Sequence, residues 1–249
     1  MSLRSLLPRY AAASAICFGI GVFSADAQIT SYSQDFESLD KNNADVLGTL
    51  PGGDGWSVGA NVFAADGTSF IYNYFAFPAP NGSGGFSNVS DAAGGALDGN
   101  QGLVIFNDYN NGDHNGDRRI EAIFFREWTI DASNVGELWE FSFLAGPGDL
   151  GGATTAQAFI KTIDGGGNAT NFLTYDTTSL GGPTNGSIQL DITAGLVGQK
   201  FQIGFDSTAS SFDPSGVNYD NINLQVVPEP SSLALVGLGA VALMRRRRG

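Results

Sequence analysis

Alternation of apolar and polar residues with a period of two constrains the fold of this chain more than any other feature. Ile188, Leu190 and Ile192, for example, alternate with Gln189 and Asp191. Successive side chains of a β-strand point to opposite faces, so the pattern predicts strands with one buried and one wet face. No stretch between residues 28 and 226 keeps a 3.6-residue apolar period for three turns, so no long helix is predicted there.

About eleven strands are predicted from this alternation and from β-branched and aromatic runs. They cover residues 32–36, 56–63, 70–77, 103–106, 120–130, 139–143, 156–163, 172–177, 188–192, 201–205 and 222–226. Clusters of Gly, Asn, Asp, Ser and Pro separate them, as is typical of turns. We therefore expect an all-β fold, a single antiparallel jelly-roll β-sandwich. Residues 78–100 contain few large apolar side chains and are expected to form a long loop over one end of the sandwich.

The first 27 residues have the three parts of a secretory signal peptide. Arg4 and Arg9 precede an apolar run, and Ala25-Asp26-Ala27 offers small residues where signal peptidase cleaves, before Gln28. A first core helix or an N-terminal membrane anchor is the alternative. Cys17, the only cysteine, lies inside this segment, so the mature chain has no disulfide and no cysteine ligand.

Residues 28–226 are expected to form one domain with a strongly acidic charge. With six basic and 23 acidic residues, its net charge is −17. Nucleic acid and anionic membranes are unfavourable partners for such a surface, because phosphates would be repelled. Divalent cations are favoured instead, and 18 of the acids are Asp, the short carboxylate that both calcium loops and ordinary turns use.

Asp113, Asn115 and Asp117 are spaced like the first ligands of an EF-hand calcium loop. The pattern then departs from that loop, since Arg118 replaces the turn glycine and Phe124 occupies the position of the last glutamate. A calcium site and a plain hydrophilic loop both remain open.

A second possible calcium site joins the two ends of the domain. Asp35 and Glu37 close the first predicted strand, and Asp220 opens the last. Terminal strands of a jelly roll lie close together, so these carboxylates are candidate ligands for a structural Ca²⁺. The alternative is that all three are solvated strand-end residues.

Catalytic signatures are mostly absent, and we do not expect an enzyme. His114 is the only histidine, which excludes a conventional triad or a multi-histidine zinc site. Glu121 with Glu127 or Glu140 is a conceivable glycosidase pair, but glutamates opposite an apolar strand face usually just form the wet face.

Aromatic side chains are candidates for stacking on sugar rings. Trp128 and Trp139 fall on the apolar phase of their strands and are expected in the core. Tyr72, Tyr74 and Tyr109 lie at more polar positions and are the preferred candidate ligand contacts.

The last 23 residues form three ordered parts. Val227, Pro228, Glu229 and Pro230 come first, followed by an apolar run from Leu233 to Met244. The chain then closes on four arginines: Arg245, Arg246, Arg247 and Arg248. About 12 to 14 apolar residues are too few to span a bilayer, which takes roughly 20. We expect a short hydrophobic helix that acts as a detachable address.

This tail resembles the PEP-CTERM sorting signal of exported Gram-negative bacterial proteins. The resemblance implies export through the inner membrane, transient anchoring there by the tail, and processing by an exosortase. It also implies a setting of exopolysaccharide, biofilm or floc. The Asp35-Phe36-Glu37 opening and residues 198–205 and 219–224 are similar to β-sandwich domains of the carbohydrate-binding-module type.

The expected function is that of a non-enzymatic cell-surface or matrix protein that binds or organises extracellular polysaccharide, with Ca²⁺ as a possible structural ion. The alternatives are a secreted glycoside hydrolase or polysaccharide lyase, and a purely structural adhesin. Signal peptidase and exosortase are the expected processing partners.

Overall fold

The computed structural model describes residues 28–42, 46–48, 53–76, 87–91, 96–109 and 111–228. The predicted signal peptide and the tail from Glu229 onward lie outside these residues, so the expected short C-terminal helix and the domain boundaries stay predictions.

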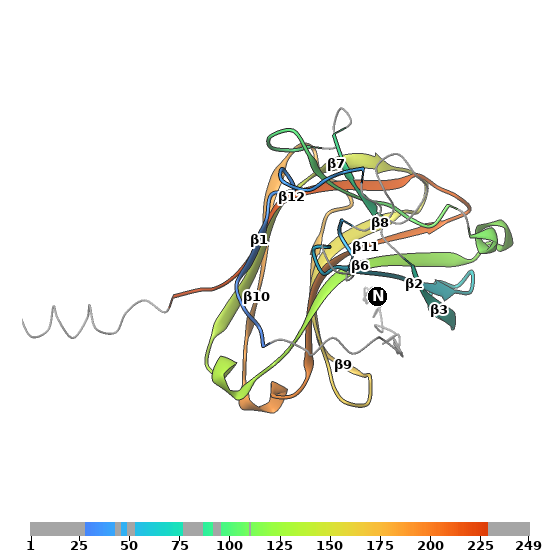
Figure 1. Cartoon of the computed structure of the whole chain (residues 1–249). Helices are drawn as coiled ribbons and strands as arrows, with labels where there is room; N and C mark the ends of the chain where they lie inside the picture. Colours follow the sequence, from blue (N-terminus) through green and yellow to red (C-terminus); the bar gives the residue numbers. More distant parts are fainter. Residues whose placement is uncertain are drawn as a thin grey trace, which may run out of the picture.

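The described strands form two antiparallel sheets of six strands each (Figure 1). Sheet A contains, in spatial order, β3 (Phe70–Ala76), β2 (Ser57–Phe63), β6 (Arg119–Thr129), β11 (Lys200–Ser210), β8 (Thr155–Ile163) and β9 (Ala169–Asp176). Sheet B contains β10 (Thr184–Asp191), β7 (Leu138–Leu150), β12 (Ser215–Val226), β5 (Gly102–Ile105) and β4 (Ser87–Ser90), and β1 (Tyr32–Gln34) also pairs with β12.

The chain crosses repeatedly between the two sheets, and this confirms the predicted jelly-roll sandwich. The connections β6–β7, β7–β8, β9–β10, β10–β11 and β11–β12 all change sheet. Two of them pass through short 3₁₀ helices, η2 (Ala132–Asn134) and η3 (Ala194–Leu196). Backbone hydrogen bonds join these corners, from Gly198 N to Ile130 O and from Gly136 N to Ile192 O.

Aromatic rings from both sheets fill the core. Trp56 stacks on Phe124 of β6 at 4.5 Å between ring centroids, and Phe205 of β11 stacks on Tyr219 of β12 at 3.8 Å. The predicted core positions of Trp128 and Trp139 are confirmed, since both are buried. This packing follows from the alternation, because the apolar phase of each strand faces the opposite sheet.

Two expectations about strand extent were wrong. Residues 78–100 are not wholly a loop, because Ser87–Ser90 pairs with β5 as a strand that carries only one large apolar residue, Val89. Strand β7 continues to Leu150, through glycines and Pro147 that were expected to form a turn. A β-bulge accommodates this proline, because Pro147 and Gly148 of β7 lie opposite the single residue Val217 of β12.

Candidate functional site

The outer face of sheet A, which points away from the core, carries several residues that are buried despite facing outward. Asn61 is 2% exposed, Gln202 is 7% and Ile123 is 8%. They come from three adjacent strands, β2, β11 and β6, and alternate with core residues such as Phe124 and Phe205. Outward-facing residues of a sandwich are usually wet, so this part of the face is recessed.

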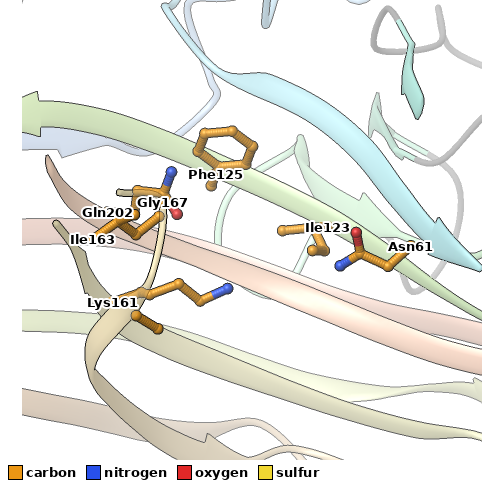
Figure 2. Close-up of a pocket in the computed structure, with 8 residues that line it drawn as sticks. Asn61, Ile123, Phe125, Lys161, Ile163, Gly167 and Gln202 are labelled. Carbon is orange, nitrogen blue, oxygen red and sulfur yellow. The ribbon is translucent and has the colours of Figure 1, made fainter. Parts of the chain in front are cut away.

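A small cavity of about 30 Å³ opens in this recess (Figure 2). We call it the outer pocket. It is lined by Asn61, Ile123, Phe125, Lys161, Ile163, Gly167, Ala169 and Gln202. In Figure 2 the side chains of Lys161 and Asn61 both extend toward Ile123, while Phe125, Ile163 and Gln202 lie near Gly167. Apolar walls with a few polar groups are the usual composition of a small-molecule site.

Asn61 presents the pocket's least satisfied polar group. Its Nδ2 donates to Glu121 Oε2 at 2.7 Å, which fixes the direction of the amide. The Oδ1 atom is buried and accepts no hydrogen bond from the described residues. A buried acceptor without a donor is costly, so this oxygen is suited to a ligand hydroxyl.

Lys161 contributes a cation to the pocket lining and lies close to two aromatic rings. Its Nζ lies 5.0 Å from the ring centroid of Phe159 and 4.7 Å from that of Phe172. Within the described part of the chain it makes no ion pair. Phe172 is 41% exposed and can offer its ring to the apolar face of a sugar.

A glycine on β11 lets the aromatic rings lie close to the strand. A Cβ atom added to Gly204 would lie 2.6 Å from Phe159 Cζ and 2.9 Å from Phe125 Cβ. Only a residue without a side chain fits there, and the two phenylalanines therefore pack over the backbone of β11.

Two carboxyl groups with different environments lie beside the pocket without lining it. Burial and the neighbouring Glu121 carboxylate raise the pKa of Asp206 well above its usual value, and Gln157 Nε2 donates to Asp206 Oδ2 at 2.9 Å. Glu127 accepts from Gln202 Nε2 at 2.6 Å and pairs with Lys200. These contacts position the side chains around the recess.

The conceivable glycosidase pairs are not formed. Glu121 and Glu127 are six residues apart on one strand, a separation of about 20 Å, whereas glycosidase carboxyl groups lie about 5–9.5 Å apart. Glu140 lies on sheet B, where Gln189 donates to it. The single histidine, His114, is buried against Phe212 and lines neither this pocket nor the larger one described below.

Glu37 and Asp220 both accept hydrogen bonds from one segment, residues 97–101. Glu37 Oε1 accepts from the backbone N–H groups of Asn100 and Gln101, at 2.7 and 2.8 Å. Asp220 Oδ2 accepts from those of Leu97 and Asp98, at 3.1 and 3.0 Å. Asp35 only caps its own turn, by accepting from Glu37 N.

The other predicted calcium ligands are not brought together. Asp113 accepts from the hydroxyl of Tyr72 and pairs with Arg118, while Asn115 and Asp117 are exposed in and after the short helix η1 (Gly112–Gly116). Among the described residues no group of three His, Cys, Asp or Glu side chains could hold a metal. Calcium stays a prediction.

The three candidate tyrosines already use their hydroxyl groups within the protein. Tyr74 donates to Asp108 Oδ2 at 2.6 Å, and Tyr109 shares a hydrogen bond of 2.5 Å with Ser215 Oγ. Burial, followed by the hydrogen bond to Asp108, raises the pKa of Tyr74. Tyr72 and Tyr74 therefore tie β3 to the loop 107–113, and their role in binding stays a prediction.

None of the described helices is long and apolar enough to cross a membrane, and most of the tail, where an anchor was expected, lies outside the described residues.

This chain is similar to three solved structures, among others, at low sequence identity. The first is the CBM22-1 xylan-binding domain of Xyn10C from Paenibacillus barcinonensis, with 11% identity, a TM-score of 0.41, and coverage of 83% of this chain and 99% of that one. The second is a family 61 carbohydrate-binding module, TmCBM61, solved with β-1,4-galactotriose, with 14% identity, a TM-score of 0.36, and coverage of 57% of this chain and 83% of that one. The third is the enzymatically active domain of tailspike protein 4 from bacteriophage CBA120, with 13% identity, a TM-score of 0.42, and coverage of 76% of this chain and 21% of that one. The aligned part thus spans about a fifth of the tailspike chain. At these identities and TM-scores, the likenesses assign neither ligand nor site residues.

No curated protein matches the sequence. Residues 226–248 match the model of the PEP-CTERM protein-sorting motif, in agreement with the resemblance of the tail. The chain therefore carries a PEP-CTERM protein-sorting motif that follows an all-β sandwich domain in the sequence.

Proposed function

We propose that this protein is sorted to the cell surface by its tail and there binds extracellular polysaccharide, without catalysis, through the outer face of sheet A. The sorting motif implies export, a membrane-anchored sorting step and exosortase processing. The resemblance of the tail implies a biofilm or floc setting, whose matrix polysaccharide would be the ligand.

The single observation that carries the binding proposal is the amide of Asn61. Its nitrogen is held by Glu121, and its buried oxygen has no donor among the described residues. A sugar hydroxyl would supply that donor, and Phe172 would contact the apolar face of the same or the next sugar.

The cavity itself is too small to enclose a sugar, since its volume is about 30 Å³. The ligand would therefore lie across the sheet face and insert one polar group beside Asn61 and Lys161. A long polymer is suited to this mode, because an open face places no limit on chain length.

Binding without catalysis is favoured by the placement of the carboxyl groups. Asp206, whose pKa is raised, is 3% exposed and does not line the pocket, so it cannot reach a glycosidic bond there. A glycoside hydrolase or lyase, and a purely structural adhesin, are the alternatives.

A panel of neutral and acidic polysaccharides tests the proposal on the exported, processed protein. Affinity electrophoresis should show retardation by at least one polymer, and a reducing-end assay should show no increase after incubation with it. Release of reducing ends or of unsaturated products would favour the enzyme, and the absence of retardation by every polymer would favour the adhesin.

A further inference from the structure

A second, larger cavity of about 320 Å³ lies at one end of the sandwich, among its loops. We call it the end pocket, and it shares no lining residue with the outer pocket. Asp66 and Gly67 come from the β2–β3 turn, Asp117 and Arg119 from the start of β6, and Ser210 and Ser211 from the end of β11. Its volume lies within the range of pockets that hold small molecules.

Arg119 is unusual among the cations of this acidic domain. Four of the six basic residues pair with a carboxylate, in the pairs Lys41–Asp91, Arg118–Asp113, Arg126–Asp54 and Lys200–Glu127. Arg119 makes no ion pair with a described residue, and its one hydrogen bond, from Nη2 to Thr155 Oγ1, is 3.4 Å long. In a domain with a net charge of −17, a guanidinium without a carboxylate partner requires a local explanation.

Asp66, in the turn beside Arg119, directs its carboxylate into that turn. Asp66 Oδ1 accepts from the backbone N–H groups of Thr68 and Ser69, at 2.9 and 2.8 Å, and its Oδ2 accepts from Ser69 Oγ. Both oxygens therefore serve the turn. These hydrogen bonds, above all those from Ser69, lower the pKa of Asp66 to about 2.

Gly67 leaves room for the side chain of Arg119 to lie against this turn. Its φ is +68°, and a Cβ atom added there would lie 3.0 Å from Arg119 Nη1 and 3.1 Å from its Cδ. The absence of a side chain lets the arginine lie along the turn backbone, with the rest of its donors available to the pocket.

The lining of the end pocket also offers other polar groups. The Asp117 carboxylate makes no hydrogen bond or ion pair with a described residue, and Ser210 and Ser211 contribute hydroxyls. Asp117 and Ser211 have φ angles of +56° and +52°, in the left-handed region that side chains disfavour. Such conformations concentrate at ligand-binding sites, where neighbouring structure holds them.

We propose that the end pocket binds a monosaccharide acid of the hexuronate type, with Arg119 holding its carboxylate and Asp117, Ser210 and Ser211 contacting its hydroxyl groups. A planar guanidinium binds a carboxylate with two parallel hydrogen bonds. A single negative charge on a polyhydroxylated body fits better than a phosphate or sulfate, because a second negative charge would be repelled by Asp66 and Asp117. This site does not depend on the proposed function of sheet A.

Calorimetric titration of the exported protein with sodium glucuronate, glucose and methyl glucuronate tests the proposal. Glucuronate should bind about tenfold more tightly than glucose or the uncharged ester, a difference of about 1.4 kcal/mol. Arg119→Gln should abolish this preference. Arg118→Gln is the matched control, since it removes the same charge from the neighbouring residue outside the pocket, and should retain it.

Two further variants keep the test decisive if Arg119→Gln folds poorly. Arg119→Lys keeps the charge but loses the two-pronged geometry, and should bind glucuronate more weakly than the wild type. Ala153→Leu fills the pocket from an exposed turn without a change in charge, and should also weaken binding. Any one of three results would overturn the proposal. These are equal affinity for glucuronate and its ester, equal losses of affinity in the Arg118 and Arg119 variants, and no binding of glucuronate.

Discussion

At the scale of single residues, Asp206 is a buried acid on the strand face where solvent-exposed side chains are expected. Its strand phase points it outward, yet it is 3% exposed and its pKa is raised by burial and by Glu121. Above about pH 4 an unfolded aspartate loses its proton while the folded one retains it. The free energy of unfolding therefore falls as pH rises from about 4 toward the folded-state pKa.

Asp206→Asn should remove this pH-dependent loss. Asparagine keeps an oxygen to accept from Gln157 but cannot ionise. In urea unfolding, the variant should gain stability relative to the wild type at pH 7 and show little gain at pH 4. Asp191→Asn, at an exposed strand end, should show no such difference between the two pH values. An identical pH dependence of wild type and Asp206→Asn would contradict the raised pKa.

Gly204 lets Phe159 and the pocket-lining residue Phe125 lie close to strand β11. Gly204→Ala should lower the free energy of unfolding by about 1–3 kcal/mol, the usual cost of overpacking, because its Cβ atom would lie 2.4 Å from the carbonyl oxygen of Phe124 and 2.6 Å from Phe159 Cζ. Gly216→Ala in β12 is the control, since its Cβ atom would meet nothing nearer than Asp149 N at 3.8 Å. Equal stability of the two variants would show that the rings do not pack over β11 in this way.

At the scale of elements, two carboxylates from the ends of the domain hold the segment 97–101. Asp220→Ala should free the backbone N–H groups of Leu97 and Asp98, which donate to it. Hydrogen exchange at these two amides should become faster, while exchange within β11 should not change. Unchanged exchange at Leu97 and Asp98 would mean that the segment is held by other contacts.

Most strands could be predicted from sequence, because alternation of apolar and polar residues is a local property of each strand. Strand β4 could not, since Ser87–Ser90 has one large apolar residue and depends on pairing with β5. The end of β7 could not either, because its glycines and Pro147 are typical of turns, and only the pairing with β12, with a bulge in β7 opposite Val217, keeps them in a strand.

The candidate sites were harder to predict than the strands. The alternation marks Asn61, Lys161 and Gln202 as outward-facing, but only the strand order brings β2, β8 and β11 into one recess. Tyr72 and Tyr74 lie in polar surroundings, and these include the carboxylates of Asp113 and Asp108, which accept hydrogen bonds from their hydroxyl groups. Hydrogen-bond partners distant in sequence cannot be read from composition.

At the scale of the whole molecule, the proposal divides the roles: the tail directs sorting and the sandwich binds polysaccharide. Replacement of Pro228, Glu229 and Pro230 by alanine should block processing, because these residues are the Pro-Glu-Pro part of the sorting motif at 226–248. Immunoblots should then show a longer chain that accumulates in the membrane fraction. Alanine at Ser231 and Ser232, immediately after the motif's prolines, is the control. Normal processing of the first variant would contradict the sorting role.

The most direct test of the account is the affinity of two asparagine variants for the polysaccharide that the wild type binds. Asn61 faces outward from sheet A, and Asn223 lies on β12 of sheet B. Asn61→Ala should weaken binding about tenfold, or about 1.4 kcal/mol, while both variants keep the wild-type melting temperature within a few degrees. Asn223→Ala should bind like the wild type. Unchanged affinity of Asn61→Ala, or an equal loss in Asn223→Ala, would contradict polysaccharide binding on the outer face of sheet A.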